Sequence, residues 1–249
     1  MRSIVHGPRP QCLGARRDLR HGPAMPAAKP KPARRRLSAA ESTRIATIFA
    51  RFEAATAHPR TELVFTSAYT LLVAVALSAQ ATDVSVNKAT LKLFAVADTP
   101  AAMLALGEEG LIPFIASIGL YRTKAKNVIA AARILMEQHG GEVPLRREAL
   151  EALPGVGRKT ASVVLNELDI EPAIAVDTHV FRVAHRLKLS DGKTPDQVEH
   201  DLMAIIPPPL RTRAHHWLIL HGRYVCVARR PKCEVCLIAD LCPSRERVA

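Results

Sequence analysis

A lysine directly after a glycine-rich turn is the first feature of this sequence with chemical potential. Segment 153–160 reads Leu-Pro-Gly-Val-Gly-Arg-Lys-Thr and lies between two predicted helices. Gly155 and Gly157 allow a tight turn with unshielded backbone N–H groups, next to a helix N-terminus that favours a phosphate. Gly-x-Gly alone is also typical of an ordinary helix–helix turn. With Arg158 and Thr160 beside it, the segment predicts a site that grips a phosphate backbone.

Lys159 itself allows two interpretations. In the first turn of the second helix it can be a simple phosphate contact. It can also be an amine nucleophile, if desolvation or a cation such as Arg158 helps it lose its proton. Asp177 follows eighteen residues later in Val-Asp-Thr-His. It can be only the N-cap of the next helix, or a carboxylate that moves a proton or stabilises positive charge near the amine. Spacing alone does not choose.

Four of the five cysteines lie close together near the C-terminus, with the spacing Cys-x6-Cys-x2-Cys-x5-Cys. They are Cys226, Cys233, Cys236 and Cys242. Four thiols in so short a segment predict a metal or cluster site, and their softness leaves zinc and iron–sulfur open. Only one Cys-x-x-Cys pair is present, which is unusual for structural zinc, and without a secretory signal disulfides are a poor alternative. Arg229, Arg230 and Lys232 give this loop positive charge suited to phosphate contact.

The composition of the 249 residues agrees with a folded protein that binds a polyanion. Hydrophobic residues make up 48%, which excludes a wholly disordered chain, and five cysteines are too few for a disulfide-stapled secreted protein. The net charge of +12 favours nucleic acid over an acidic membrane. Most of that charge lies in residues 1–36, which hold ten Lys and Arg and one acid, whereas the remainder carries only 25 basic and 22 acidic groups.

We expect a solvated, disordered basic tail at residues 1–39. Residues 1–36 contain six of the 18 prolines and no apolar repeat or signal-peptide run. A mitochondrial transit peptide is the less favoured alternative, because Ser3 is the only serine among residues 1–36 and the prolines there interrupt any helix. Met25 is a plausible alternative start, and Cys12 an unimportant free thiol.

From Ser38 onward the pattern is helical almost throughout. Ile45 begins an apolar stripe at i, i+3, i+4 and i+7, and residues 63–79 predict a helix buried on all sides. Asp98-Thr99-Pro100 and Thr194-Pro195-Asp196-Gln197 are typical helix starts. Further helices are expected near 84–94, 99–106, 111–118, 122–138, 146–152, 158–168, 178–188, 195–205 and 211–225. No alternating strand pattern separates them, so the predicted fold is all-α.

Together these segments resemble endonuclease III, the helix-hairpin-helix DNA glycosylase/AP lyase family. The resemblance rests on the hairpin at 153–160, the Val-Asp-Thr-His segment and the cysteine array, and it extends to Leu-Ser-Ala-Gln-Ala-Thr-Asp at 77–83 and Ile-Gly-Leu-Tyr at 118–121. It covers roughly residues 40–245, in order. It implies a two-lobed all-α fold with DNA in the cleft between the lobes. A six-helix barrel would span 61–171, and a discontinuous cluster lobe would combine 40–60 with 172–249.

The resemblance also implies a cofactor and a mechanism. A 4Fe-4S cluster on the four cysteines would order the basic loop. The enzyme would extrude a damaged base from the duplex, and Gln80 and Leu120 would enter the vacated stack. Lys159 would attack the sugar C1′ and form a Schiff base, Asp177 would assist deprotonation, and β-elimination would cleave the strand. His179 would support the site, while the pair His215 and His216 is expected on a helix surface.

Three alternatives remain beside this hypothesis. An adenine-specific mismatch glycosylase is disfavoured, because Lys159 is present and segment 78–83 has no glutamate. A pyrimidine-dimer glycosylase shares the lysine chemistry and is not excluded. A non-catalytic DNA-binding or iron–sulfur protein would use Lys159 only as a phosphate contact.

The expected partner is double-stranded DNA with oxidised pyrimidines or abasic sites. We expect a monomer that does not bind membranes. The bacterial cytoplasm, in association with the nucleoid, is the expected location, and mitochondrial import of a eukaryotic homologue is the alternative.

Overall fold

The computed structural model describes residues 37–245, and within them every regular element is helical. Residues 1–36 of the tail expected at 1–39 and the last four residues lie outside the described range, whereas Ala39, the last residue of that expected tail, begins the first helix with Ser38 as its N-cap. All of the described residues belong to one compact unit. The all-α prediction is therefore confirmed for residues 37–245. None of the helices in that range is long and apolar enough to cross a membrane.

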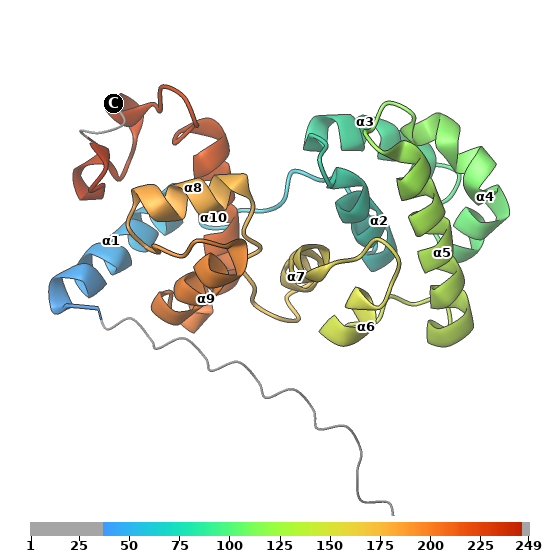
Figure 1. The fold of residues 1–249 in the computed structure, drawn as a ribbon, viewed down its shortest axis with the longest axis horizontal. Helices are drawn as coiled ribbons and strands as arrows, with labels where there is room; N and C mark the ends of the chain where they lie inside the picture. The colour runs from blue at the N-terminus through green and yellow to red at the C-terminus, as the bar shows by residue number, and fades with distance from the viewer. Residues whose placement is uncertain (1–36, 246–249) are drawn as a thin grey trace, which may run out of the picture. The chain divides into compact units, whose positions relative to one another are not determined.

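Figure 1 labels the α-helices, which are numbered in chain order. The α-helices of the described part are α1 (Ala39–Ala55), α2 (Ala68–Ser78), α3 (Asp83–Phe94), α4 (Pro100–Ile115), α5 (Tyr121–His139), α6 (Arg147–Glu151), α7 (Arg158–Glu167), α8 (Thr178–Arg186), α9 (Pro195–Ile205) and α10 (Arg211–Tyr224). Three short 3-10 turns follow or separate them: η1 (Pro208–Leu210), η2 (Cys233–Val235) and η3 (Ala239–Leu241).

Two of the expected helix starts are present in full. Thr194 caps α9 in a capping box with Gln197, so each residue's side chain binds the other's backbone N–H. Thr99 caps α4, and Pro100 occupies its first turn. Short-range rules suffice at these positions because the capping groups lie within three residues of each other in the sequence.

The helix expected over 63–79 begins only at Ala68. Ser67 is its N-cap, and a capping box with Thr70 fixes the start. The polar residues Ser67 and Thr70 within the expected range therefore mark where the helix starts. The break expected between 99–106 and 111–118 occurs at Gly107, where φ is +67° and ψ is 177°, inside the merged helix α4.

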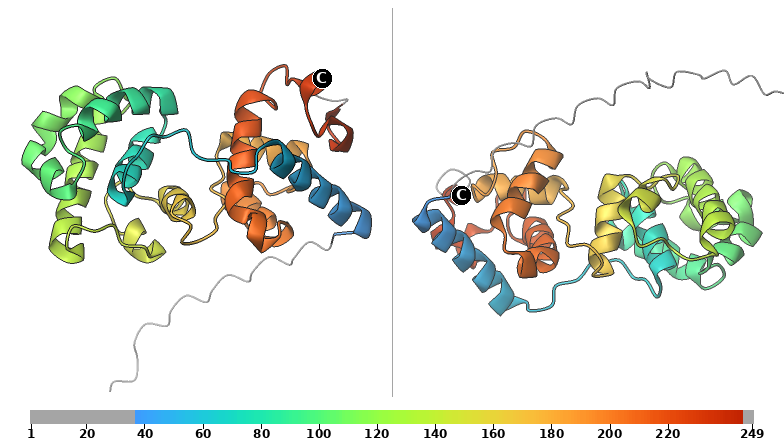
Figure 2. Two further views of the ribbon diagram at one scale, coloured as in Figure 1. Left: turned by 180° about the vertical axis from the view of Figure 1, so that it is seen from behind. Right: turned by 90° about the horizontal axis from the view of Figure 1, so that it is seen from below.

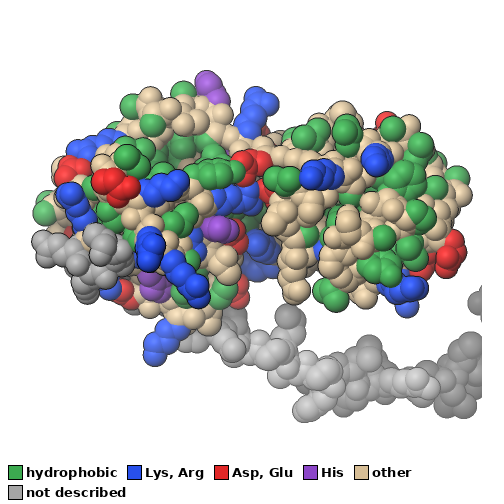
Figure 3. Space-filling view, turned by 90° about the horizontal axis from the view of Figure 1, so that it is seen from above, with side chains coloured by type: hydrophobic (Ala, Val, Ile, Leu, Met, Phe, Trp, Pro, Cys, Tyr) green, Lys and Arg blue, Asp and Glu red, His purple; other side chains and the backbone are tan. Residues whose placement is uncertain are grey.

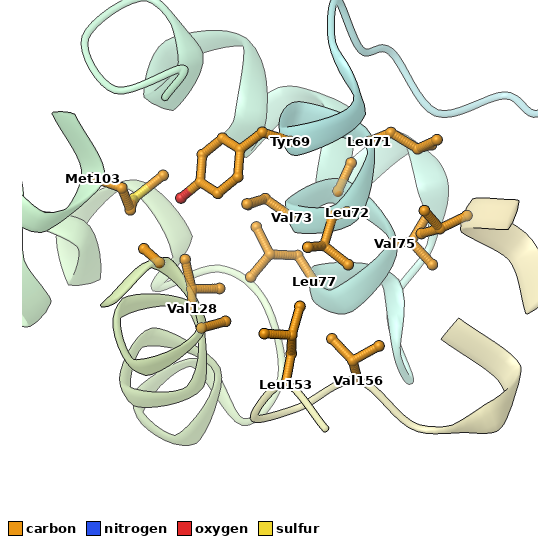
Figure 4. Close-up of a cluster of buried hydrophobic side chains, with 14 of the residues drawn as sticks. Tyr69, Leu71, Leu72, Val73, Val75, Leu77, Met103, Val128, Leu153 and Val156 are labelled. Carbon is orange, nitrogen blue, oxygen red and sulfur yellow. The ribbon is translucent and has the colours of Figure 1, made fainter. Parts of the chain in front are cut away.

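The buried side chains form two separate hydrophobic clusters. The first joins α2 to α7 and runs from Leu63 to Leu165, and Figure 4 shows part of it around Leu77 and Leu153. The second joins α1 to α8, α9 and α10 and the segment as far as Ile238. The views in Figure 2 show α1 beside α10, although most of the chain lies between them in sequence.

Polar contacts tie α1 to the C-terminal segment as well. The guanidinium of Arg51 pairs with both carboxylate oxygens of Asp240, at 2.5 and 2.8 Å. Arg44 donates to the backbone carbonyls of Leu187 and Leu241. The first described helix is thus completed by residues from the opposite end of the chain.

Candidate active site

A cavity of about 730 Å³ brings the candidate catalytic residues together. Lys159 and Asp177 both line it, and so does Gln80. Its other walls come from segment 60–63 and from α10. In the space-filling view, basic, acidic and histidine side chains meet in a hollow near the middle of the face shown (Figure 3). The site thus draws on both hydrophobic clusters.

Lys159 lies in the first turn of α7, and its side chain is exposed. Val163 and Glu167 follow at intervals of four residues and line the same cavity. Positions four apart lie on one face of a helix, so α7 presents one continuous face to the cavity.

The hairpin before Lys159 is anchored by apolar residues and shaped by one glycine. Leu153 and Val156 are buried in the first cluster (Figure 4). Gly155 has φ +79°, a left-handed conformation that side chains rarely adopt, and a Cβ there would lie 2.9 Å from Asn127 Cβ. Gly157 is the N-cap of α7 and provides no side-chain cap. The first backbone N–H groups of α7 are therefore available to a phosphate.

Asp177 is the N-cap of α8. Its Oδ1 accepts hydrogen bonds from the backbone N–H of His179 and of Val180, both at 2.8 Å. Among the described residues Oδ2 has no hydrogen-bond partner, and Asp177 also lines the cavity. The two interpretations of this residue are therefore compatible: one oxygen caps the helix and fixes the carboxylate, and the other is free for chemistry.

The pair His215 and His216 does not lie on a helix surface, and that expectation was wrong. The two side chains are only 3% and 4% exposed, and both residues line the cavity. Residues 214–218 of α10 are all buried, because this turn of the helix faces the second cluster on one side and the cavity on the other. Adjacent residues on a helix both become buried only when the helix is covered on several sides.

These two histidines are buried titratable side chains that line one side of the cavity. His216 Nε2 lies 2.8 Å from Glu167 Oε1, and both side chains are almost fully buried. Burial, and then the nearby charges of His216 and Lys159, lower the pKa of His215 to about 3, so its imidazole is neutral. Its Nδ1 has no hydrogen-bond partner within residues 37–245. Glu167 was not among the candidate residues, since a single glutamate at a helix end gives no signal in the sequence.

Arg223 of α10 connects the rim of the cavity to α3 and to segment 60–63. Its guanidinium contacts the carboxylates of Glu62 and Asp83. Burial opposes the ionisation of Glu62, but hydrogen bonds from Tyr224 and Arg223 outweigh it and lower the pKa of that carboxyl. All four lie in ordinary polar sequence, so spacing alone could not single them out.

Gln80 and Leu120 occupy two turns that lie next to each other. Each adopts a left-handed backbone conformation, with φ of +57° and +59°, which is uncommon for residues other than glycine. A Cβ on Gly119 would lie 4.0 Å from the backbone oxygen of Gln80. Leu120 is 62% exposed, a large apolar side chain presented to solvent. The structure therefore brings together two predicted DNA-facing residues that are 40 positions apart in the sequence.

The remaining candidates for phosphate contact differ in their surroundings. Thr160 lines the cavity, whereas Arg158 forms an ion pair with Glu199 of α9 at 3.3 Å. Further away, the basic loop carries three exposed candidates, which are Arg229, Arg230 and Lys232. Arg186 of α8 holds this loop, because its guanidinium donates to the carbonyls of Val227 and Ala228 at 2.7 and 3.0 Å.

The four cysteines line a single cavity beside the basic loop. All four are free thiols, without disulfides. Within residues 37–245 no group of three or more His, Cys, Asp or Glu is arranged to hold a single metal ion. Four soft thiol donors that line one cavity have the chemistry to hold an iron–sulfur cluster.

Comparison with known proteins places this arrangement among DNA repair proteins. Residues 73–208 match the HhH-GPD superfamily of base excision DNA repair proteins. Residues 226–242 match the iron–sulfur binding domain of endonuclease III.

Curated relatives extend the match over most of the chain. The chain is 61% identical over 191 residues to endonuclease III of Escherichia coli (strain K12), which covers 77% of this chain and 90% of the relative. It is 56% identical, over the same shares of both chains, to endonuclease III of Haemophilus influenzae.

Solved structures agree in fold. A trapped covalent intermediate of endonuclease III with DNA is similar, with a TM-score of 0.78 and 41% identity, over 85% of this chain and 99% of that one. A non-covalent endonuclease III–DNA complex matches with the same score and identity, over 85% of this chain and 98% of that one. A thermostable thymine-DNA glycosylase shares the fold at 23% identity, with a TM-score of 0.74.

Proposed function

Because the chain belongs to the endonuclease III family of the HhH-GPD superfamily, and is therefore a DNA glycosylase and AP lyase of base excision repair, we propose that Lys159 is its nucleophile and Asp177 its proton-handling carboxylate. One observation carries this assignment: the two residues open into one cavity from the starts of neighbouring helices. An amine and a carboxylate held at a common space are the groups that Schiff-base chemistry needs.

We propose duplex DNA with oxidised pyrimidines or abasic sites as the substrate. One solved relative is a trapped covalent intermediate of endonuclease III with DNA, and another is a non-covalent endonuclease III–DNA complex. A base inside a duplex is out of reach of a side chain in a cavity, so the damaged nucleotide must be extruded. Gln80 and Leu120 would fill the space that it leaves, and the exposure of Leu120 supports that role.

In the proposed reaction, the unprotonated Nζ of Lys159 donates its lone pair to C1′ of the extruded nucleotide. The glycosidic C–N bond breaks, its electron pair leaves with the base, and the base takes up a proton. Asp177 stabilises the positive charge that develops on the sugar and accepts a proton from Nζ. That proton passes to the ring oxygen as the C1′–O4′ bond opens, which leaves a Schiff base between Nζ and C1′.

Strand cleavage follows from the Schiff base. Water takes up a proton from C2′, and the electrons of the C2′–H bond form a C1′=C2′ enamine with the lone pair on Nζ. The enamine electrons then form the C2′=C3′ double bond and restore the imine, as the C3′–O bond breaks with its electron pair on the 3′ phosphate. Water then hydrolyses the imine and restores the amine of Lys159. Both bond-breaking steps thus use one covalent link, which explains why a single lysine can serve glycosylase and lyase.

The DNA backbone would be gripped at two places. At the hairpin, the N–H groups near Gly155 and Gly157 would bind a phosphate, with Arg158 and Thr160 beside them. At the cluster loop, positive charge would come from Arg229, Arg230 and Lys232. Neither contact reads base sequence, as suits an enzyme that must recognise damage anywhere.

The chain carries a 4Fe-4S cluster, and we propose that its ligands are the four thiols that line one cavity: Cys226, Cys233, Cys236 and Cys242. When bound, the cluster supplies strong Fe–S bonds that cross-link four points of segment 226–242. Arg186 complements it from α8, because it donates to Sγ of Cys226 at 3.4 Å and to the loop carbonyls. The basic loop is thereby held in shape from two sides.

The domain organisation is part of the same proposal. We assign a six-helix barrel to 61–171 and a discontinuous cluster domain to 40–60 and 172–249, which agrees with the two hydrophobic clusters. We propose that the protein acts as a monomer, since one chain supplies every residue of the cavity. We also propose a location in the bacterial cytoplasm near the nucleoid: the bacterial relatives support the cytoplasm, and the nucleoid follows from the proposed DNA substrate.

Borohydride trapping tests the assignment. Duplexes with thymine glycol, an abasic site or a cyclobutane dimer would be incubated with the wild type, with Lys159→Ala and with Lys88→Ala, an exposed lysine on α3. We expect covalent adducts with thymine glycol and abasic DNA for the wild type and Lys88→Ala, and none for Lys159→Ala. Trapping by Lys159→Ala would refute the nucleophile. Preferential trapping on the dimer would make the protein a pyrimidine-dimer glycosylase.

A further inference from the structure

A single buried lysine connects the two turns that face the DNA. Lys124 lies one turn into α5 and is only 8% exposed. Its Nζ donates to the backbone oxygens of Leu77 and Ala79, at 2.9 and 2.7 Å. No acidic side chain in residues 37–245 forms an ion pair with it, so its partners are carbonyls alone. We propose that Lys124 is a positioning residue that couples Gln80 and Leu120, on the basis of the insertion role proposed above for both.

The contact with α2 acts directly on Gln80. Leu77 and Ala79 lie at the C-terminal end of α2, where the last carbonyls of a helix lack intrahelical partners and attract a cation. The oxygen of Ala79 belongs to the same rigid peptide unit as the N–H of Gln80. Holding that oxygen fixes the plane from which the Gln80 backbone turns into its left-handed conformation.

The other end of the coupling is Leu120. It is the N-cap of α5 and has no side-chain cap, and the N–H of Lys124 donates to its carbonyl at 3.0 Å. The backbone of Lys124 therefore holds the Leu120 turn while its side chain holds the Gln80 turn. A left-handed conformation at both residues is costly, and such strain persists only where the surroundings enforce it.

The same helix also supports the hairpin. Asn127 lies one turn after Lys124, and its side chain fills the space in which a Cβ of Gly155 would lie. α5 thus contacts three of the segments that are proposed to meet DNA: its own N-terminus, the Gln80 turn and the hairpin. A rigid helix that spans them would keep their spacing constant while the base is extruded.

Substitution of Lys124 by methionine tests the coupling. Lys124→Met keeps the length of the side chain and removes the donor, and Lys126→Met removes the same charge from an exposed position of α5. We expect Lys124→Met to lower single-turnover excision of thymine glycol from a duplex by roughly ten- to a hundredfold, because small misplacements of positioning groups cost that much. Cleavage of an abasic site in single-stranded DNA, which needs no extrusion, should stay near the wild-type rate. Lys126→Met should match the wild type on both.

A double-mutant cycle separates positioning from a general loss of stability. If Lys124 acts through Gln80, then Lys124→Met should add little to the defect of Gln80→Ala, whereas independent effects would multiply. Equal loss on duplex and single-stranded DNA, an equal defect in Lys126→Met, or multiplicative effects in the cycle would each overturn the proposal.

A second variant and the wild-type activity itself complete the test. If Lys124→Met fails to fold by circular dichroism, Lys124→Gln, which retains an N–H donor at neutral charge, takes its place in the same comparisons. A wild-type protein inactive on both substrates would instead refute the proposed function and not the coupling.

Discussion

The helices α7 and α8 both begin at the same cavity, but only α8 has a side-chain N-cap. α8 begins at Asp177, whose carboxylate satisfies two of the first N–H groups of its own helix. α7 begins at Gly157, which has no side chain and leaves its N–H groups unpaired. A capped start is internally complete and can lend a fixed carboxylate to chemistry. An uncapped start needs an external partner and is suited to hold a phosphate. The two helix starts therefore have different proposed roles: the start of α8 provides a catalytic carboxylate, and the start of α7 provides amides that bind a phosphate.

The largest effect on the excision rate is expected at Asp177, which is both the N-cap of α8 and the proposed catalytic carboxylate. Asp177→Asn keeps an oxygen for capping and removes the charge, so we expect the excision rate to fall by roughly 10²- to 10⁴-fold with little change in thermal stability. Asp177→Ala should lose the same activity and also about 1 kcal/mol of unfolding free energy. Single-turnover kinetics and denaturant titration measure the two. Full activity in Asp177→Asn would reduce this residue to a cap.

The next effect distinguishes the two glycines of the uncapped start. Gly155→Ala places a Cβ 2.9 Å from Asn127 in a left-handed backbone, and should cost about 1–3 kcal/mol of unfolding free energy. Gly157→Ala meets no heavy atom within 4 Å and should cost less than about 1 kcal/mol. Urea denaturation of both variants checks this. Equal costs would show that backbone conformation does not set the hairpin.

A third substitution makes α7 resemble α8. Gly157→Asp provides a carboxylate that can cap the helix and that also repels a phosphate. We expect equal or higher thermal stability, and affinity for duplex DNA lower by roughly tenfold, because a hydrogen bond to a charged group contributes about 1.5–3 kcal/mol. Fluorescence anisotropy with an undamaged duplex measures the affinity. Unchanged binding would mean that the hairpin amides do not contact DNA.

The smallest effect should come from the cluster loop, where exposed side-chain cations, and not the N–H groups of a helix start, are proposed to contact phosphates. Arg229→Gln removes one exposed cation from the cluster loop. The dependence of log K on log salt concentration should become shallower by about one unit, with a modest loss of affinity across all sequences. Glu234→Gln on the same loop is the matched control and should leave the slope unchanged or steeper. An unchanged slope in Arg229→Gln would remove this residue from the proposed contact.

How much could be predicted from the sequence depends on the range of the interaction. The capping box at Thr194, the glycine break in α4 and the cysteine spacing all involve residues close in the chain, and each predicted feature has a counterpart in the structure. The burial of His215 and His216 depends on what covers α10 from distant segments, so local polarity led to the wrong prediction.

The surroundings of Lys124 could be predicted from the sequence only in part. It shares the apolar stripe of Val128, Ala131 and Leu135 at intervals of four, three and four residues, so a cation at a core position was visible in the sequence. Its partners were not, because the two carbonyls belong to a helix end more than 40 residues away.

The connection of α1 to the C-terminal segment has a consequence for the order of folding. The first hydrophobic cluster uses residues 63–165 and can close as soon as that stretch leaves the ribosome. The second needs α1 together with residues as late as Ile238. During synthesis, Phe49 and Phe52 cannot pack against Trp217, their aromatic partner in the folded protein, until that late part of the chain has emerged. The first cluster can thus fold during synthesis before α1 has its partners from the C-terminal part of the chain.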